Sequence, residues 1–263
     1  MSTDLDTLES GRTTEFVQSL ERGLAVLTSF SAEHARMTLS DVARQAGLTR
    51  ATARRLLHTL DALGYVVSDG RYFELTPRVL DIGYAYLSSL QVGEIALPYM
   101  EALSERVHES VSAAVLDGDE IVYVARVPTT RIMRIALALG SRLPALATSM
   151  GRVLVADLPP DRRADFLRTA RMPAMTERTT TDPALVASIL DEVRAQGFAL
   201  VDQELEDGVR SIAAPLRDRS GRVIAAVNIG TQISRVTMKQ LRGEFLPMLL
   251  DCAATISAQL TKR

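Results

Sequence analysis

Residues 40–75 contain the pattern that most limits what this chain can fold into. Ser40 is suited to cap a short helix that ends at Gly47, and Thr49 is suited to cap a second helix that ends at Gly64. Two β-prone runs follow, and the Asp-Gly pair between them favours a tight hairpin. The apolar stripe expected on the second helix consists of Ala53, Leu56, Leu57, Leu60 and Leu63. The pattern predicts a helix-turn-helix followed by a wing.

The charge of this segment differs from that of the whole chain. The 263 residues carry a formal net charge of −2, yet residues 36–78 contain seven arginines against four acids. No acid occurs between Thr49 and Leu60, so the exposed face of the second helix can approach phosphates without repulsion. An ordinary helical hairpin with a solvated face is the alternative, but such a face normally mixes both signs of charge.

We therefore predict that this segment binds double-stranded DNA. The first turn of the second helix has small side chains that would let it enter a major groove, where arginine can pair with guanine. The residues expected to contact DNA are Ser40, Thr49, Arg50, Ala51, Thr52, Arg54, Arg55, His58 and, at the tip of the wing, Arg71. For Arg71, the role of an uninvolved surface arginine is nearly as well supported.

The length of the chain fits two domains. Thr76-Pro77 is a pair that opens a helix, and after residue 107 the apolar period changes to two. Antiparallel strands are expected at 111–116, 121–127, 132–139, 211–216 and 223–229, with residues 140–144 as a loop. Together with the intervening helices they predict an α+β domain. The expected division is a disordered arm at 1–14, a winged helix-turn-helix at 15–76, a linker helix at 77–92 and a second domain at 93–263.

Several classes of protein are disfavoured by what the sequence lacks. No run approaches the ~20 consecutive apolar residues of a membrane helix, and residues 1–12 are polar and acidic, unlike a secretory signal. We expect a cytoplasmic protein without membrane association. Cys252 is the single cysteine, which leaves no disulfide framework and no thiolate metal cluster.

The sequence also lacks the parts of an active site. Its three histidines, His34, His58 and His108, have no metal-ligand spacing, and neither a nucleophile elbow nor a phosphate-binding glycine loop occurs. We expect no enzymatic activity, no metal and no cofactor. A small-molecule enzyme with a helical interaction domain remains the rival class, because an α+β domain with a pocket can host chemistry. The acidic cluster Asp202, Glu204 and Glu206 suggests acid–base chemistry or a divalent ion. Such alternating acids beside a strand more often serve as solvated or loop-fixing groups.

A second rival is a pure interaction module, in which the first helices serve only for dimerisation. The basic face of residues 49–58 argues against it. A single DNA-binding unit contacts few base pairs, so we expect dimers that bind two half-sites. The helix at 77–90, which carries Tyr84, Tyr86 and Leu87, is a candidate dimer seam, and its alternative is a place in the intramolecular core.

Several segments resemble the IclR (isocitrate lyase regulator) family of transcription factors across about residues 15–260. They are residues 16–27 (FVQSLERGLAVL), 39–63, 72–83 (YFELTPRVLDIG), 140–144 (GSRLP), 147–152 (ATSMGR), 202–211 (DQELEDGVRS) and 225–230 (AAVNIG). The resemblance implies a winged helix-turn-helix joined to a GAF-like α+β effector-binding domain with an antiparallel sheet. It also implies homodimers, often paired into tetramers as a dimer of dimers, that a small organic acid switches.

The resemblance places an effector pocket in the second domain. Its residues map onto Ile132, Ile135, Ser149, Met150, Asp202, Val209, Ser211, Asn228 and Gly230. The chain departs from the commonest family pattern by Gly151-Arg152 in place of Gly-Lys, by Ser211 in place of cysteine and by Asn228 in place of serine.

Residues 131–134 (RIMR), 141–144 and 148–152 are similar to the subgroup that controls aromatic-acid catabolism, the protocatechuate and β-ketoadipate regulators. A non-aromatic organic acid is the alternative effector. Because a buried carboxylate must be paired, Arg126 and Arg134 are the candidate partners of the acid, and either can instead be a surface charge.

Overall fold

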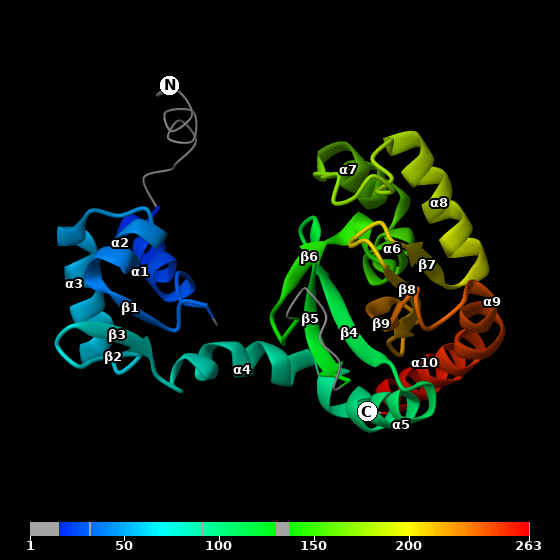
Figure 1. Ribbon diagram of the computed structural model, residues 1–263, viewed down its shortest axis with the longest axis horizontal. Coiled ribbons are helices and arrows are strands. Elements are labelled where there is room, and N and C mark those ends of the chain that lie inside the picture. The colour runs from blue at the N-terminus through cyan, green and yellow to red at the C-terminus, as the bar shows by residue number, and fades with distance from the viewer. Residues whose placement is uncertain (1–15, 32, 91, 130–136, 263) are drawn as a thin grey trace. The chain divides into compact units, whose positions relative to one another are not determined.

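The chain folds into two compact units, as the computed structural model shows for residues 16–31, 33–90, 92–129 and 137–262 (Figure 1). The units divide between Ser88 and Ser89, within helix α4 (Val79–Leu90). The N-terminal unit is mainly helical with a small three-stranded sheet, and the C-terminal unit combines helices with a six-stranded antiparallel sheet. The predicted fold class is thereby confirmed. The arm expected at residues 1–14 lies outside the described residues.

The N-terminal unit has a helix-turn-helix followed by a β-hairpin. Its helices before the hairpin are α1 (Gln18–Thr28), α2 (Leu39–Gln45) and α3 (Arg50–Ala62). Its strands β1 (Arg36–Thr38), β2 (Val66–Ser68) and β3 (Tyr72–Leu75) pair antiparallel in the order β1-β3-β2. One apolar cluster joins helices and strands through Val26, Met37, Val42, Leu57, Leu60 and Val66. Because α3 buries one face in this cluster, its other face is turned outward.

Threonine caps set the starts of α2 and α3. Thr49 Oγ1 accepts a hydrogen bond from the Thr52 amide at 3.2 Å, which confirms the predicted cap of α3. The predicted cap of α2 was wrong: Thr38, not Ser40, is the N-cap, and it forms a reciprocal capping box with Asp41. Strand β1 ends at Thr38, so the helix begins directly from the strand before Ser40 is reached. The hydrogen bonds from Thr38 lower the pKa of the Asp41 carboxyl.

In the apolar stripe of α3, Ala53, Leu57 and Leu60 are buried and Leu56 is partly buried, whereas the end of the stripe is exposed. Leu63 was expected in the stripe but is 51% exposed, because it is the C-cap residue at which the chain leaves the helix. Gly64 follows with a φ of 78°, a left-handed conformation that glycine adopts without strain, and the chain turns there toward β2.

The C-terminal unit is built on one antiparallel sheet. Its strands, in the order β6-β5-β4-β9-β8-β7, are β6 (Arg142–Pro144), β5 (Glu120–Val127), β4 (Ser110–Asp117), β9 (Val223–Gln232), β8 (Val209–Arg217) and β7 (Ala199–Asp202). The hairpins β4–β5 and β8–β9 meet where β4 pairs with β9. This junction brings residues near 110 beside residues near 230 in the middle of the sheet.

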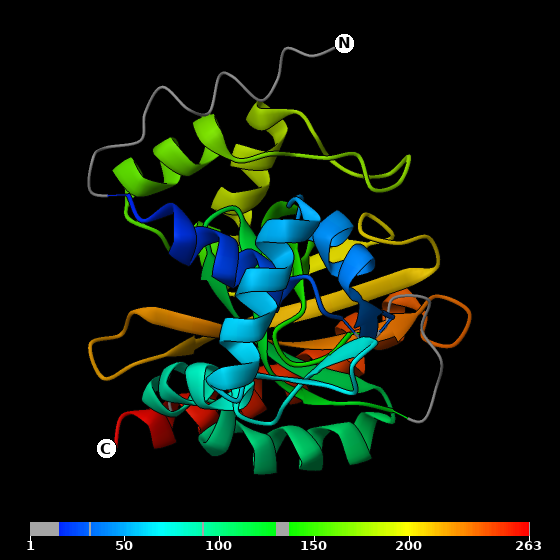
Figure 2. The same cartoon turned by 90° about the vertical axis from the view of Figure 1, so that its left-hand side faces the viewer.

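Helices cover both faces of this sheet (Figures 1 and 2). On one face, α5 (Val92–Val107) and α10 (Leu246–Leu260) pack together over a cluster that includes Val111, Val227 and Ile229. On the other face lie α6 (Ser149–Ala156), α7 (Pro160–Thr169) and α8 (Pro183–Gln196), with Met150, Leu154 and Leu190 in their cluster. A short helix, α9 (Met238–Gln240), and a π-helical turn (Leu241–Phe245) lead into α10.

Two predictions for the segment between β5 and α6 need correction. The loop expected at residues 140–144 contains strand β6, which pairs with the start of β5. Arg142 stabilises that edge, because its guanidinium binds both Asp117 and Glu120 at 2.7 Å. Of the strand expected at 132–139, residues 130–136 lie outside the described residues, and residues 137–139 are not in a strand. Within the described parts of the chain, no helix has both the length and the apolar character that a membrane crossing requires.

Candidate nucleic-acid interface and ligand pocket

The outward face of α3 carries basic side chains at its N-terminal end. Arg50, Arg54, Arg55 and His58 are exposed, while the opposite face is buried in the apolar cluster. Arg54 Nε lies 3.5 Å from His58 Nε2, one helical turn away, so these two side chains lie along one side of the helix. The first turn has its amide groups and small side chains at the tip, where the helix dipole favours phosphate. The geometry is that of a helix able to enter a groove of DNA.

The wing beside α3 is held by its turn residue, Asp69. Its carboxylate accepts hydrogen bonds from the amides of Arg71 at 2.9 Å and Tyr72 at 2.8 Å, and it also pairs with Arg36. These backbone hydrogen bonds, with Arg36 adding to them, lower the pKa of Asp69 to about 2. The guanidinium of Arg71 lies 5.1 Å from the centre of the Tyr72 ring. Arg71 thus lies on a hairpin whose turn is held by hydrogen bonds, and its side chain remains exposed.

A groove of about 480 Å³ separates α3 from the wing and the start of α2. Five of the residues expected to contact DNA line it: Ser40, Arg50, Arg54, His58 and Arg71. Thr49, Ala51, Thr52 and Arg55 are also on or beside α3, outside the groove. The groove contains one acid, Asp61, near its end on α3. Three elements that are separate in the sequence therefore present their polar and basic side chains to a single surface.

In the C-terminal unit, one face of the sheet changes from apolar to polar along its strands. Ala114, Ala213 and Ala226 belong to the cluster under α6 and α8. Two and four residues further along, the alternation of strand side chains brings polar or small residues to the same face. These residues are Ser112 and Ser110 on β4, Ser211 on β8, and Asn228 and Gly230 on β9.

The strand register arranges these side chains in two rows. Arg126, Ser112 and Asn228 pair in succession across β5, β4 and β9. In the next row, Ser110 and Ser211 flank Gly230. A Cβ atom built on Gly230 would meet nothing within 4 Å, so the space over this part of the sheet is open.

A cavity lies over the two rows. Its remaining lining residues are Tyr123, Leu137, Ala147, Thr148, Val201, Leu205 and Val209. Thr148 is the N-cap of α6, so that helix begins at the cavity wall, and its first N–H groups favour an anion. Arg126 is the charged residue of the lining, and within the described part of the chain it has no acidic partner. The cavity thus combines one cation, several hydroxyls and apolar walls, which suits a small acid.

The hydroxyl groups of the cavity are mostly engaged. Ser211 Oγ lies 2.9 Å from Ser149 Oγ, Ser112 Oγ accepts from Arg126 at 3.3 Å, and Ser110 Oγ lies 3.3 Å from Thr129 Oγ1. Burial raises the pKa of Tyr123 to about 12, against the opposing effect of Arg126, so its phenol stays protonated. One group differs: Asn228 Oδ1 is buried without a hydrogen-bond partner among the described residues.

The expected effector residues fall into three sets. Arg126, Val209, Ser211, Asn228 and Gly230 line the cavity. Ser149, Met150 and Asp202 do not: Ser149 contacts the cavity through Ser211, Met150 is buried in the core, and Asp202 pairs with Arg210 at 2.8 Å. Ile132, Arg134 and Ile135 lie outside the described residues.

Sequence reasoning missed four polar lining residues, Ser110, Ser112, Tyr123 and Thr148. The period-two alternation of β4 was a usable signal for the two serines, since they share a face with Ala114. The alternation could not show that β9 lies beside β4, and this pairing is what makes that face of β4 part of the cavity.

Two acids of the cluster at 202–206 form ion pairs: Asp202 with Arg210 and Glu204 with Arg152. Arg152 binds Glu204 through two hydrogen bonds of 2.7 and 2.6 Å and also donates to the Leu146 carbonyl at 2.9 Å. Burial by itself would raise the pKa of Glu204, but the hydrogen bond and charge of Arg152 outweigh it, and the pKa is lowered. Leu205, the next residue, lines the cavity, so this pair fixes one of its walls. In the described residues, no group of three or more acids, histidines or cysteines is arranged to hold a metal.

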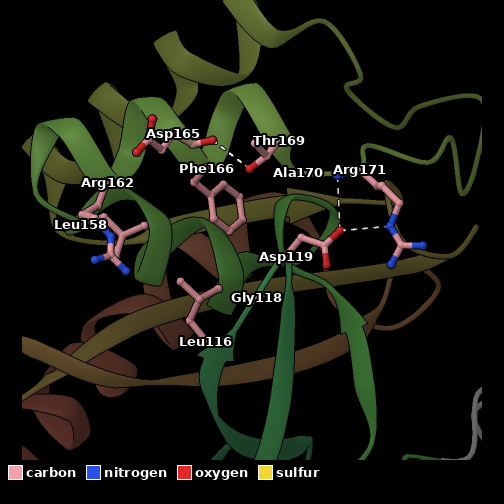
Figure 3. A pocket seen from close by; sticks show the side chains of 10 residues that line it. All are labelled: Leu116, Gly118, Asp119, Leu158, Arg162, Asp165, Phe166, Thr169, Ala170 and Arg171. Carbon is pink, nitrogen blue, oxygen red and sulfur yellow. Dashed lines mark hydrogen bonds and ion pairs between the residues drawn. The ribbon is translucent and has the colours of Figure 1, made fainter. Parts of the chain in front are cut away.

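A larger and more open groove of about 840 Å³ lies between the β4–β5 turn and α7 (Figure 3). Its floor contains Leu116 and Phe166, and its rim carries Asp119, paired with Arg171 at 3.2 Å, together with Arg162 and Asp165. The lining has two arginines and two acids, so the groove has no net charge to attract an anion. Its exposed ion pair is also screened by solvent. The enclosed cavity over the sheet is the better candidate for an acidic ligand.

Comparison with known proteins gives the same assignment for both units. The model of the IclR helix-turn-helix domain matches residues 19–70, and the model of the bacterial transcriptional regulator IclR C-terminal region matches residues 84–258. The Pca regulon regulatory protein of Pseudomonas putida is 44% identical over 94% of this chain and 85% of its own length. The p-hydroxybenzoate hydroxylase transcriptional activator of Acinetobacter baylyi is 36% identical over 93% and 92% of the two chains.

Solved structures agree over the same length. A putative transcriptional regulator from Rhodococcus sp. RHA1 is 51% identical, with a TM-score of 0.83 over 93% of this chain and 98% of that one. An IclR homolog from Microbacterium hydrocarbonoxydans, crystallised in complex with 4-hydroxybenzoate, is 26% identical, with a TM-score of 0.81 over 92% and 98% of the two chains.

Proposed function

The chain belongs to the IclR family of transcription regulators, and from this premise we propose that a small aromatic acid, bound in the cavity over the C-terminal sheet, controls its binding to DNA. It is a DNA-binding transcription regulator and not an enzyme. The observation that carries the proposed effector site is Arg126, a half-buried cation without an acidic partner among the described residues, in a cavity with apolar walls. A carboxylate provides the missing partner. The relatives that regulate Pca genes, and the relative crystallised with 4-hydroxybenzoate, support an aromatic acid.

Binding of such an acid requires the cavity to adjust. Its enclosed volume is about 50 Å³, well below the several hundred Å³ of typical ligand sites. Leu137 and Leu205 are the bulky apolar residues of its wall that come from connecting segments rather than strands. Their displacement by a ring gives the acid different affinities for two arrangements of the C-terminal unit, which is the requirement for a switch.

For the DNA complex we propose that the exposed residues of α3 enter the major groove and that Arg71 contacts the backbone from the wing. The support is the groove between α3 and the wing, which Arg50, Arg54, His58 and Arg71 line. Arginine side chains at the start of such a helix can pair with guanine or with phosphate. Because the family is one of bacterial transcriptional regulators, we propose that the chain acts in the cytoplasm.

We further propose that the chain acts as a homodimer or a dimer of dimers, with helix α4 linking the units and contributing to the seam. The support is apolar surface that the monomer leaves uncovered. On α4, Leu80 is 72% exposed and Ile82 is 54% exposed, and on α1, Leu20 is 62% exposed. Single exposed apolar residues are ordinary, but several on two helices of one small unit favour an interface.

The effector proposal is tested by thermal unfolding of the full chain with 4-hydroxybenzoate, 3,4-dihydroxybenzoate and adipate. A ligand at 100 times its Kd stabilises the folded state by about 2.7 kcal/mol, which a thermal-shift assay resolves. We expect stabilisation of the native protein by the aromatic acids, its loss in Arg126→Gln, and its retention in Arg171→Gln, which alters the open groove instead. A response to adipate alone would favour a non-aromatic acid, and an unchanged response in Arg126→Gln would refute the role of this cation.

A further inference from the structure

We infer that Asn228 determines which acids the cavity accepts, because its side-chain oxygen takes a hydrogen bond from a hydroxyl group of the effector. The inference rests on the proposed function, since it concerns the same cavity. It goes further by naming the feature that the acid must carry besides its carboxylate. Hydroxylated aromatic acids satisfy it, whereas unsubstituted aromatic acids and dicarboxylic acids do not.

The first step of the argument is the state of the Asn228 oxygen. Asn228 is 9% exposed, and its Oδ1 has no hydrogen-bond partner among the described residues. A buried carbonyl oxygen without a donor costs about 1–3 kcal/mol relative to one that is paired. Ser112 and Ser211 accept hydrogen bonds from Arg126 and Ser149, and neither hydroxyl lies within hydrogen-bond geometry of Asn228 Oδ1. A ligand that brings its own donor therefore gains affinity at this point.

The second step is the position of Asn228 relative to Arg126. The two residues flank Ser112 in one row across the sheet. The Arg126 guanidinium leans over that serine, at 3.3 Å from Ser112 Oγ, so it lies about one strand spacing, about 5 Å, from the strand that carries Asn228. A carboxylate bound by Arg126 and a hydroxyl bound by Asn228 can then belong to one small ring.

The third step is the room for that ring. Gly230 follows Asn228 on the same face, and the space above it is open. The apolar side chains Val201, Leu205 and Val209 form the wall on that side. A flat ring over Gly230 would contact these side chains and keep its polar groups along the row of Arg126 and Asn228.

Three kinds of acid differ in the hydrogen bonds that they can make to Arg126 and Asn228. An unsubstituted benzoate satisfies Arg126 and leaves the Asn228 oxygen unpaired. A dicarboxylate places a second anionic oxygen, which can only accept, against Asn228 Oδ1, which in the orientation of the structure also only accepts. A hydroxybenzoate supplies an acceptor at Arg126 and a donor at Asn228, so both groups of the protein are satisfied.

Isothermal titration calorimetry of the full chain with benzoate, 3-hydroxybenzoate, 4-hydroxybenzoate and adipate tests the inference. In the native protein we expect at least one hydroxybenzoate to bind about tenfold more tightly than benzoate, the value of one satisfied buried acceptor. In Asn228→Leu, which keeps the bulk and removes the acceptor, benzoate and hydroxybenzoate should bind equally. Asn228→Ala serves as a second variant if the leucine protein does not fold.

Gly230→Val is the matched control, because it narrows the same part of the cavity and leaves Asn228 in place. It should weaken benzoate and hydroxybenzoate alike and preserve the ratio between them. An unchanged ratio in Asn228→Leu and Asn228→Ala would overturn the inference while leaving the effector site intact. Tighter binding of adipate than of hydroxybenzoate, dependent on Asn228, would also overturn it, since the amide would then act as a donor. Failure of every acid to bind would instead refute the proposed effector site itself.

Discussion

The DNA-binding surface and the effector cavity differ in how far apart their residues lie in the sequence. The basic face of α3 comes from nine consecutive residues, Arg50 to His58, and its orientation follows from a cap and an apolar stripe on the same helix. The cavity takes its polar groups from four strands, which begin at Ser110, Glu120, Val209 and Val223, and from the start of α6. A local surface can be altered by local changes, whereas the cavity depends on the packing of a whole domain.

Charge reversal on α3 tests the DNA-binding surface, the local one of the two sites, and has the largest expected effect. In Arg54→Glu/Arg55→Glu, two contacts worth about 1–3 kcal/mol each are lost, so affinity for a duplex that the protein selects from a random pool should fall about 1,000-fold. Fluorescence anisotropy measures the fall. The slope of log Kd against log salt concentration should also be shallower in this variant than in the native protein, because fewer phosphates are contacted.

The matched control for this variant is Arg219→Glu, which reverses an exposed arginine in the β8–β9 turn. DNA affinity should change little there. Thermal unfolding, oligomer size and binding of 4-hydroxybenzoate should stay the same in both variants. If the double variant still bound DNA with the native salt dependence, α3 would not be the recognition helix.

Removal of Arg152 tests the cavity, because its partner Glu204 directly precedes Leu205 in the cavity wall. Arg152→Met leaves the mostly buried Glu204 carboxylate without its cation, and breaking such a pair costs about 3 kcal/mol of unfolding free energy. Urea unfolding at pH 7 measures this loss. Arg168→Met, at an exposed pair on α7, should cost almost nothing.

The contribution of Glu204 to the pH dependence of stability should have opposite signs in the native protein and in Arg152→Met. In the native protein the pKa of Glu204 lies below its ordinary value of 4.5, so its contribution to stability is present above pH 4.5 and is lost as the pH falls through the lowered pKa. In Arg152→Met, burial raises that pKa instead, and the variant should recover stability relative to the native protein as the pH falls below 7. A constant difference between the two proteins from pH 7 to pH 4 would contradict the assigned ion pair.

A smaller effect is expected at the cap of α3. Thr49→Ala removes the acceptor of the Thr52 amide and should destabilise the N-terminal unit by about 1 kcal/mol. Thr49→Ser, which keeps the hydroxyl, is the control. Hydrogen exchange of amides in the first turn of α3 should report the loss, and the cavity residues should be unaffected. Faster exchange spread over both units would mean that the two units do not unfold independently.

The sequence was informative where structure is local. Thr49 could be identified as a cap because its partner is three residues away, and Ala53, Leu57 and Leu60 could be placed in the core by their spacing. The cap at Ser40 was misplaced because β1 pairs with β3 and ends at Thr38, a contact that the local pattern does not contain.

The cavity was predictable only in part for the same reason. Arg126, Ser211 and Asn228 were named, through family resemblance and the need of a carboxylate for a cation, and they line it. Ser110 and Ser112 acquire their role from the pairing of β4 with β9, which joins residues more than a hundred positions apart. Asp202 and Glu204 were expected to be solvated or loop-fixing groups rather than a metal site, and each pairs with an arginine that the sequence alone does not identify as its partner.

The measurement that tests the central claim most directly is the Kd for a selected DNA duplex with and without saturating 4-hydroxybenzoate, for the native protein and for Arg126→Gln. Coupling between two sites is typically worth 1–3 kcal/mol, so the native Kd should change at least about fivefold, in either direction. The Kd of Arg126→Gln should not respond to the acid. An unchanged native Kd, at an acid concentration that raises the unfolding temperature of the same protein, would contradict the claim that the acid bound over the sheet controls the helix that reads DNA.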